Sequence, residues 1–173
     1  MTAGGSAVAA VEAAIRVLED DPTFNAGRGA VLNAAGEVEC DAAIMDGADL
    51  SVGGVAAVRT LRHPISVARR MLPERPDAAG RRGRGSLRPP TRPGILRAWR
   101  THAAVGRSSP GCDTVGCVAL DREGDIAAGT STGGLSGCAV GRVGTSPLPG
   151  CGLYADNAVG GVSLSGEGEA SSA

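Results

Sequence analysis

The order of apolar and polar positions predicts a chain of short helices and strands. An amphipathic helix is predicted over residues 5–19, because the spacing of Val8, Val11, Ile15 and Leu18 places them on one helical face. Asp20-Asp21-Pro22 ends this helix, since proline disfavours helical geometry in the residue before it. A second, shorter helix is expected over residues 65–72, after His63-Pro64.

Strands are predicted where apolar residues alternate or form short runs between turn residues. The expected strands cover residues 30–32, 37–45, 52–59, 115–120, 126–130 and 159–164. Asp121 to Gly124 is expected to be a hairpin turn. Residues 131–150 are rich in glycine and are expected to be irregular.

Composition limits the kinds of function. Apolar residues make up 42% of the 173 residues, but aromatic residues only 2%, so the core must consist of small aliphatic side chains. A net charge of −1 gives no reason to expect nucleic acid or an acidic membrane as a partner. No long apolar run and no basic, apolar leader are present, so we expect a cytoplasmic protein that does not span a membrane.

The five cysteines form no CxxC pair, and the chain has two histidines. Neither a disulfide framework nor a zinc site is indicated. We therefore expect the cysteines to be small buried side chains.

Residues 73–110 differ from the rest because arginine and proline dominate them. Such a composition does not support a packed core, so a solvated loop is expected. The segment lacks the regular spacing and interleaved aromatic residues of a nucleic-acid-binding surface.

The candidate chemistry lies at the junction between Asp113 and Thr114. Cleavage of this peptide bond would free an amine beside the Thr114 hydroxyl and so combine a nucleophile and a base in one residue. Ser131-Thr132-Gly133-Gly134 and Gly141-Arg142-Val143-Gly144 follow. None of these residues alone is specific, but their joint spacing points to a hydrolase with an N-terminal nucleophile.

The chain resembles the family of isoaspartyl peptidases and plant-type L-asparaginases, which is related to glycosylasparaginase and threonine aspartase. The resemblance covers residues 3–72 and 111–170 and rests on FNAGRGAVLNAAGEVECDAAIMDG, DTVGCVALD, TSTGG, GRVG, SPLPGCGLYADN and SGEGE. It implies an α+β fold, a four-layer αββα sandwich, which here looks truncated at both ends. It also implies self-cleavage between Asp113 and Thr114, with residues 1–113 as the α-chain part and 114–173 as the β-chain part.

The resemblance assigns roles by motif position. Thr114 would be the nucleophile and, once freed, the base, Thr132 would keep it poised, and Ser165 and Gly166 would form the oxyanion hole. Arg142 would clamp the substrate α-carboxylate, with Asn25 and Thr145 as further substrate-binding positions. No cofactor is required. A structural sodium ion would be held by the backbone carbonyls of Leu18, Glu19, Asp21, Phe24, Ala26 and Arg28.

The implied activity is hydrolysis of β-aspartyl peptides, L-asparagine or both, by a homo-oligomer of processed units. Thr145 stands where asparaginases have an aspartate that pairs with the substrate amine, which weakens the assignment of asparagine as substrate. A threonine-aspartase-like endopeptidase and a glycosylasparaginase are alternatives. A further alternative is an inactive gene remnant that does not process itself.

Two places where the resemblance fails suggest frameshifts, at residues 77–110 and 170–173. With suitable codons, Asp77 to Gly83 shifted by one base reads Met-Leu-Leu-Val-Gly-Glu-Gly, which resembles the family's next strand and turn. Restoring one base turns Glu169 to Ala173 into Glu-Ala-Phe-Ile-Arg. The nucleotide sequence would decide this hypothesis.

Overall fold

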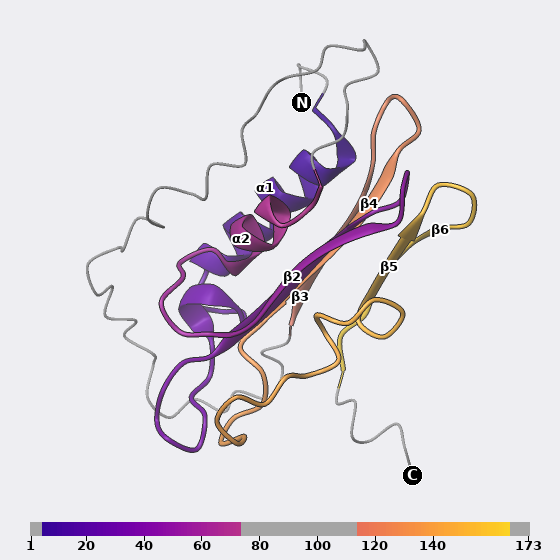
Figure 1. The fold of residues 1–173 in the computed structure, drawn as a ribbon. Coiled ribbons are helices and arrows are strands. Elements are labelled where there is room, and N and C mark those ends of the chain that lie inside the picture. The colour runs from indigo at the N-terminus through magenta and orange to yellow at the C-terminus, as the bar shows by residue number, and fades with distance from the viewer. Residues whose placement is uncertain (1–4, 74–113, 167–173) are drawn as a thin grey trace.

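The computed structural model describes residues 5–73 and 114–166 (Figure 1). Three sets of sequence-based expectations lie outside the described residues. They are the cleavage junction at Asp113, the basic loop and frameshift within residues 74–110, and the frameshift over residues 170–173. The elements are α1 (Ala7–Asp20), η1 (Gly27–Gly29), β1 (Cys40–Asp46), β2 (Ser51–Val58), α2 (Pro64–Arg70), β3 (Val115–Leu120), β4 (Ile126–Thr132), β5 (Leu153–Asp156) and β6 (Gly160–Ser163).

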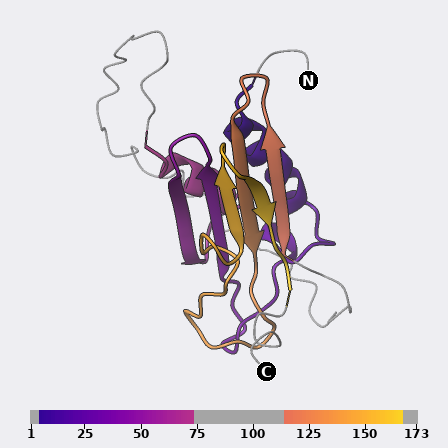
Figure 2. The same ribbon diagram turned by 90° about the vertical axis from the view of Figure 1, so that its right-hand side faces the viewer.

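The strands form two antiparallel sheets. One has four strands in the order β2-β1-β4-β3, and the other is the hairpin of β5 and β6. Helices α1 and α2 cover one face of the four-stranded sheet, and the hairpin lies against the other face (Figures 1 and 2). The described residues are therefore α+β, in three layers of helices, sheet and second sheet.

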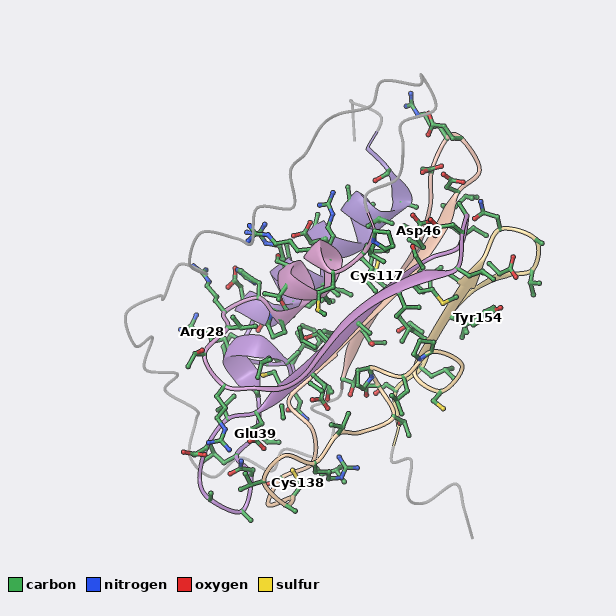
Figure 3. All side chains as sticks on the ribbon, viewed as in Figure 1. Arg28, Glu39, Asp46, Cys117, Cys138 and Tyr154 are labelled. Atoms are coloured by element: carbon green, nitrogen blue, oxygen red, sulfur yellow. The ribbon has the colours of Figure 1, made fainter. Side chains whose placement is uncertain are left out.

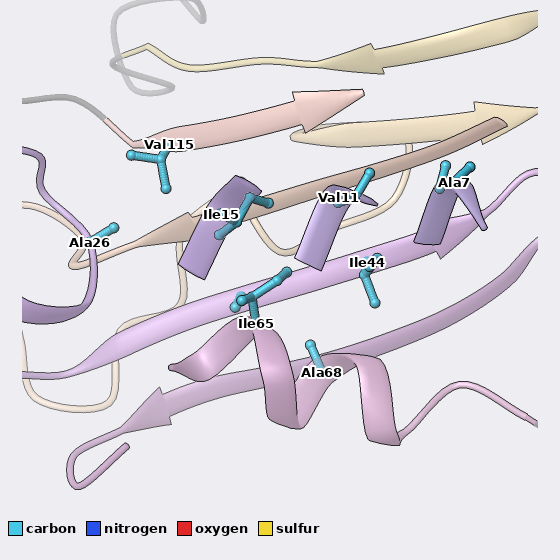
Figure 4. Packing of buried hydrophobic residues seen from close by; sticks show 10 residues of the cluster. Ala7, Val11, Ile15, Ala26, Ile44, Ile65, Ala68 and Val115 are labelled. Carbon is cyan, nitrogen blue, oxygen red and sulfur yellow. The ribbon is translucent and has the colours of Figure 1, made fainter. Parts of the chain in front are cut away.

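The core on the helical side is built from small aliphatic residues, as the composition predicts. Figure 4 shows Val11 and Ile15 of α1 and Ile65 of α2 packed over Ile44 of β1, all with no exposed surface. A Cβ atom at Gly129 of β4 would lie 2.6 Å from Val11 Cγ1, so only glycine lets α1 approach this closely. A second cluster, between the sheets, contains Ala43, Met45, Ala128, Leu153 and Ala155.

Polar side chains fix where α1 begins. Ser6 accepts a hydrogen bond from the Ala9 amide at 3.3 Å, which is an N-cap. The Ala7 amide donates to Asp121 Oδ2 at 2.9 Å. Asp121 lies in the turn between β3 and β4, where its Oδ1 accepts from the amides of Glu123 and Asp125, so it ties the helix to this hairpin.

Two sequence-based expectations about the elements are wrong. Residues 30–32 form no strand, only an isolated bridge of Leu32 with Val38. Ser131 and Thr132 are not irregular but are the last two residues of β4. The strand expected over residues 37–45 is present as β1, although it begins at Cys40 and is buried along its whole length because both of its faces are covered. β5, which pairs with β6, lies in a stretch where the sequence pattern predicts no strand.

The cysteines only partly follow the expectation of burial. Cys40 is buried, which raises the pKa of its thiol to about 12, and Cys117 and Cys138 are half-buried. Cys151 is exposed, because it lies in the loop before β5. In the described ranges the cysteines are free, and no group of acidic, histidine and cysteine side chains could hold a metal ion. The helices of these ranges are not long and apolar enough to cross a membrane.

Candidate active site

The candidate active site lies at the sheet end where β4 finishes and β3 begins. Thr132 is the last residue of β4, and Thr114 comes just before β3. Val115 pairs with Ser131, so the register places Thr114 opposite Thr132. Thr114 Oγ1 donates to Thr132 Oγ1 at 2.9 Å. The structure therefore brings these two predicted residues into direct contact.

Thr132 is held firmly in this position. Thr132 is 2% exposed, and its hydroxyl also accepts a hydrogen bond from the Gly134 amide at 3.1 Å. Thr114 is half-buried, and its hydroxyl lies 3.4 Å from the hydroxyl of Ser146. The Thr114 hydroxyl therefore lies between two other hydroxyls, one of which, that of Thr132, also accepts from a backbone amide.

Sequence reasoning did not single out Ser146. Its carbonyl accepts from Thr130 Oγ1 at 2.6 Å, and a Cβ atom at Gly152 would lie within 2.6 Å of its backbone. These contacts fix the Ser146 backbone under the Thr114 hydroxyl. The signal available in the sequence was that Ser146 is the first residue of the motif SPLPGCGLYADN, to which no role was assigned residue by residue.

Asn25 supports the residues after Thr132 instead of contacting Thr114. Its side-chain Nδ2 donates to the Gly134 carbonyl at 2.7 Å, and its own carbonyl accepts from the Gly133 amide at 2.8 Å. A Cβ atom at Gly133 would lie 2.4 Å from Asn25 Oδ1, so glycine is required for this close packing. The predicted turn at Asn25 thus lies directly against the end of β4.

Arg142 and Thr145 lie in a loop over residues 141–146, which we call the arginine loop. Arg142 is half-buried and Thr145 is exposed. A Cβ atom at Gly144 would be 3.4 Å from Arg142 Nη1, so the guanidinium lies against the Gly144 backbone. The loop leads directly into Ser146 and hence to the hydroxyl of Thr114.

Ser165 and Gly166 follow β6 and are exposed. Across the layers, a Cβ atom at Gly161 would meet Val118, and one at Gly116 would meet the Ser163 side chain. β6 therefore runs antiparallel to β3 across the layers, with residue 161 against residue 118 and residue 163 against residue 116. If this pattern continues by two residues, Ser165 is expected near Thr114. Ser165 also lines a small pocket with Gly116 and Cys117.

Behind the site, on the helical face, lies a carboxylate that sequence analysis did not predict. Glu19 has no exposed surface, and its Oε1 accepts from Ser131 Oγ at 2.7 Å and from the Ile65 amide at 3.1 Å. Burial raises the pKa of Glu19 to about 7, although these hydrogen bonds oppose the shift. His63 Nδ1 lies 3.2 Å from Oε2. Glu19 thus joins α1, α2 and β4 directly beside Thr132.

The expected sodium ligands lie in the loop from the end of α1 to η1. A Cβ atom at Gly27, where φ is +53°, would lie 2.6 Å from the Glu19 carbonyl oxygen. One at Gly29 would lie 2.1 Å from the Phe24 carbonyl oxygen. Only glycine allows the backbone to pack this closely against these two carbonyls, and the Phe24 carbonyl also accepts a hydrogen bond from the Ala26 amide at 2.9 Å. Neutral oxygen ligands of this kind fit a hard alkali cation.

The described residues therefore form an α+β structure with two antiparallel sheets and a pair of threonine hydroxyls in contact at one sheet end. A family model described as asparaginase matches residues 1–79 and 96–171. This match covers well over half of the chain, so the chain belongs to the asparaginase family. The unmatched residues 80–95 lie within the basic segment predicted from composition.

Several curated proteins are similar along nearly the whole chain. The isoaspartyl peptidase/L-asparaginase of Macaca fascicularis is 46% identical over 183 residues, covering 96% of this chain and 59% of the relative. The Homo sapiens protein of the same name gives the same values. The Rattus norvegicus protein is 45% identical over 186 residues, covering 98% of this chain and 56% of the relative. The chain thus spans a little over half of the length of these relatives.

Proposed function

We propose that this protein is a threonine hydrolase that cleaves β-aspartyl peptides, L-asparagine or both after cutting its own chain between Asp113 and Thr114. The observation that carries the proposal is the 2.9 Å hydrogen bond between Thr114 and Thr132 in a chain of the asparaginase family. The names of the similar proteins support the substrate class.

Self-cleavage would begin with Thr114 Oγ adding to the carbonyl carbon of Asp113. The hydroxyl proton passes to the Thr114 nitrogen, the C–N bond breaks, and an ester joins Asp113 to the threonine oxygen. Water hydrolyses this ester, leaving a carboxylate on Asp113 and a free α-amine on Thr114. Thr132 orients the attacking oxygen in this step.

In the mature site the freed amine would act as the general base. It accepts the proton as Thr114 Oγ attacks the substrate amide carbonyl, and it returns the proton to the departing ammonia or amine. Water then attacks the ester left on Thr114 and gives one proton to the amine, and the ester C–O bond breaks, which releases the carboxylate product and restores the Thr114 hydroxyl. Ser165 and Gly166 would stabilise the negative oxygen with a hydroxyl and an amide. Arg142 would bind the α-carboxylate through two parallel hydrogen bonds.

Further parts of the proposal concern assembly and the ion. We propose a four-layer αββα sandwich, in which the helices, the sheet and the β5–β6 hairpin provide three layers, and a homo-oligomer of processed units. A sodium ion bound by the α1–η1 loop would fix Asn25, since Phe24 and Ala26 flank it. The free thiols of the described residues favour a cytoplasmic location.

One departure favours an alternative substrate. Thr145 lacks the carboxylate that would pair with a substrate amine, which should weaken binding of free asparagine by about 1.5 to 3 kcal/mol. This favours substrates that also contact the site through groups beyond the α-amine and α-carboxylate. Such substrates are β-aspartyl peptides or, as an alternative function, an aspartate-containing segment of a protein.

The purified full-length chain should be assayed with L-asparagine and with a β-aspartyl dipeptide, measuring released aspartate. We expect release from the dipeptide, weaker release from asparagine and none from Thr114→Ala. Equal release by wild type and Thr114→Ala would exclude the proposed nucleophile. Cleavage of a protein after aspartate with no release from either small substrate would favour the endopeptidase.

A further inference from the structure

A row of three side chains crosses the sheet at the candidate active site. Asp41 of β1 pairs with Thr132 of β4, which in turn lies opposite Thr114. Paired residues of an antiparallel sheet project from the same face. Asp41 therefore lies on the far side of Thr132 from Thr114, on the same face of the sheet. The resemblance to the family assigns it no role.

Asp41 connects the sheet to the arginine loop. Its Oδ2 accepts from the Gly144 amide at 3.2 Å, and its Oδ1 accepts from the Ala57 amide at 2.8 Å. Asp41 is 4% exposed. The Gly144 backbone that it holds is the one against which the Arg142 guanidinium lies.

The backbone around Asp41 is unusual in a way that favours a special role. The register between β1 and β2 shifts between Cys40 and Ala42, which is a β-bulge. Ala57 in this bulge has φ of +49°, a left-handed conformation that is costly for a residue with a Cβ atom. Bulges and strained residues gather beside functional sites, where they re-aim a group. Here the bulge aims an amide at Asp41.

Glu39 makes the second connection, at the other side of Arg142. Its Oε2 accepts from the Gly141 amide at 2.8 Å, and its Oε1 accepts from Arg59 Nε and Nη2. The Gly141 amide and the Arg59 guanidinium hold the pKa of Glu39 below its ordinary value. Figure 3 shows Glu39 at the end of the molecule where the loop bearing Cys138 also lies.

We propose that Glu39 and Asp41 are positioning residues that set the direction of Arg142 for binding the substrate carboxylate. The inference rests on the proposed function. Two carboxylates, Glu39 just before β1 and Asp41 within it, accept hydrogen bonds from the amides of residues 141 and 144, which bracket Arg142. Because both are anchored in turn, by Arg59 and by the bulge, the arginine loop is preorganised before substrate arrives.

Loss of either carboxylate should raise KM with little change in kcat. Carboxylate clamping by Arg142 holds the substrate in ground state and transition state alike, and loss of such uniform binding appears in KM. Self-cleavage does not use Arg142, because the scissile bond belongs to the chain itself. It should therefore proceed in both variants.

The test compares wild type, Glu39→Gln, Asp41→Asn and Glu37→Gln, with a β-aspartyl dipeptide as substrate. Glu37 is the matched control, because it pairs with Arg59 but is about half exposed. We expect KM to rise about tenfold in Glu39→Gln and Asp41→Asn, from the loss of a hydrogen bond to a charged group. KM of Glu37→Gln should stay near the wild-type value, and a denaturing gel should show two fragments in every case.

The outcomes separate the inference from the function on which it rests. Wild-type KM in both Glu39→Gln and Asp41→Asn would overturn the positioning role and leave the hydrolase intact. An equal rise in Glu37→Gln would also overturn it, since a general charge effect would then be responsible. A wild-type chain that neither cleaves itself nor hydrolyses the dipeptide would overturn the proposed function and the inference together.

Discussion

Replacing Thr132 with valine tests the hydroxyl pair at the candidate active site. Valine has nearly the shape of threonine, so it should fit a position that is 2% exposed. The substitution removes the acceptor for the Thr114 hydroxyl at 2.9 Å and for the Gly134 amide at 3.1 Å. The nucleophile would lose its orientation, and a backbone amide would lose its partner.

The size of the effect follows from these two bonds. A net hydrogen bond contributes about 1 kcal/mol, and a buried donor left without a partner costs about 1 to 3 kcal/mol. Each 1.36 kcal/mol in the barrier changes a rate by about tenfold. Self-cleavage of Thr132→Val should therefore slow by about 10-fold to 100-fold.

The assay is a time course of the freshly made precursor on a denaturing gel. Cleavage before Thr114 of the 17.1 kDa chain should give fragments of about 11 and 6 kDa, by their shares of the residues. Thr132→Ser keeps the hydroxyl and should restore most of the rate. Circular dichroism confirms that the variants are folded. A folded Thr132→Val precursor that processes at the wild-type rate would refute the orienting role.

Three further predictions concern the structure around the site. Asp121→Asn should lower the free energy of unfolding at pH 7 by about 1 kcal/mol, since it weakens the bond to the Ala7 amide that begins α1. Partial burial of Asp121 raises its pKa, but hydrogen bonds from amides including that of Ala7 outweigh this and hold the pKa below its ordinary 3.8. The stabilisation by Asp121 is therefore complete above pH 3.8 and is lost as the pH falls through the lower pKa of the folded state. Urea denaturation at several pH values measures this, and a difference between wild type and variant that stays constant down to pH 2 would contradict it. Gly133→Ala should disturb the contact with Asn25 and slow self-cleavage at least tenfold on the same gel, because the added Cβ atom would lie 2.4 Å from Asn25 Oδ1; unchanged processing would show that the contact is unimportant. Ala57→Gly should raise the free energy of unfolding by about 1 kcal/mol by relieving the left-handed conformation, and a lowered thermal midpoint would show that this strain is absent.

Local patterns predicted most of the secondary structure. The apolar spacing of Val11 and Ile15 placed α1, and the hairpin of β3 and β4 followed from apolar runs on either side of a polar turn. Position in the fold decided the rest. β1 is buried on both faces only because helices and a second sheet enclose it, and no local pattern contains that information.

Sequence motifs predicted part of the candidate site. Motif spacing named Thr114 and Thr132, which the structure places in contact. Glu19, Glu39 and Asp41 were not predicted as side chains of interest, because their partners lie far away in the sequence. Glu19 reaches Ser131, and Asp41 reaches Gly144. Acidic residues near a helix end or strand start are ordinarily solvated, so only the tertiary structure identifies these as buried acceptors.

The central claim is that Thr114 becomes a chain terminus whose amine can accept the proton that its hydroxyl loses. Intact-mass spectrometry and N-terminal sequencing of purified, folded full-length protein test this directly. We predict a fragment that begins at Thr114 in wild type and an uncut 17.1 kDa chain in Thr114→Ala. A folded wild-type chain whose bond between Asp113 and Thr114 stays intact would contradict the account.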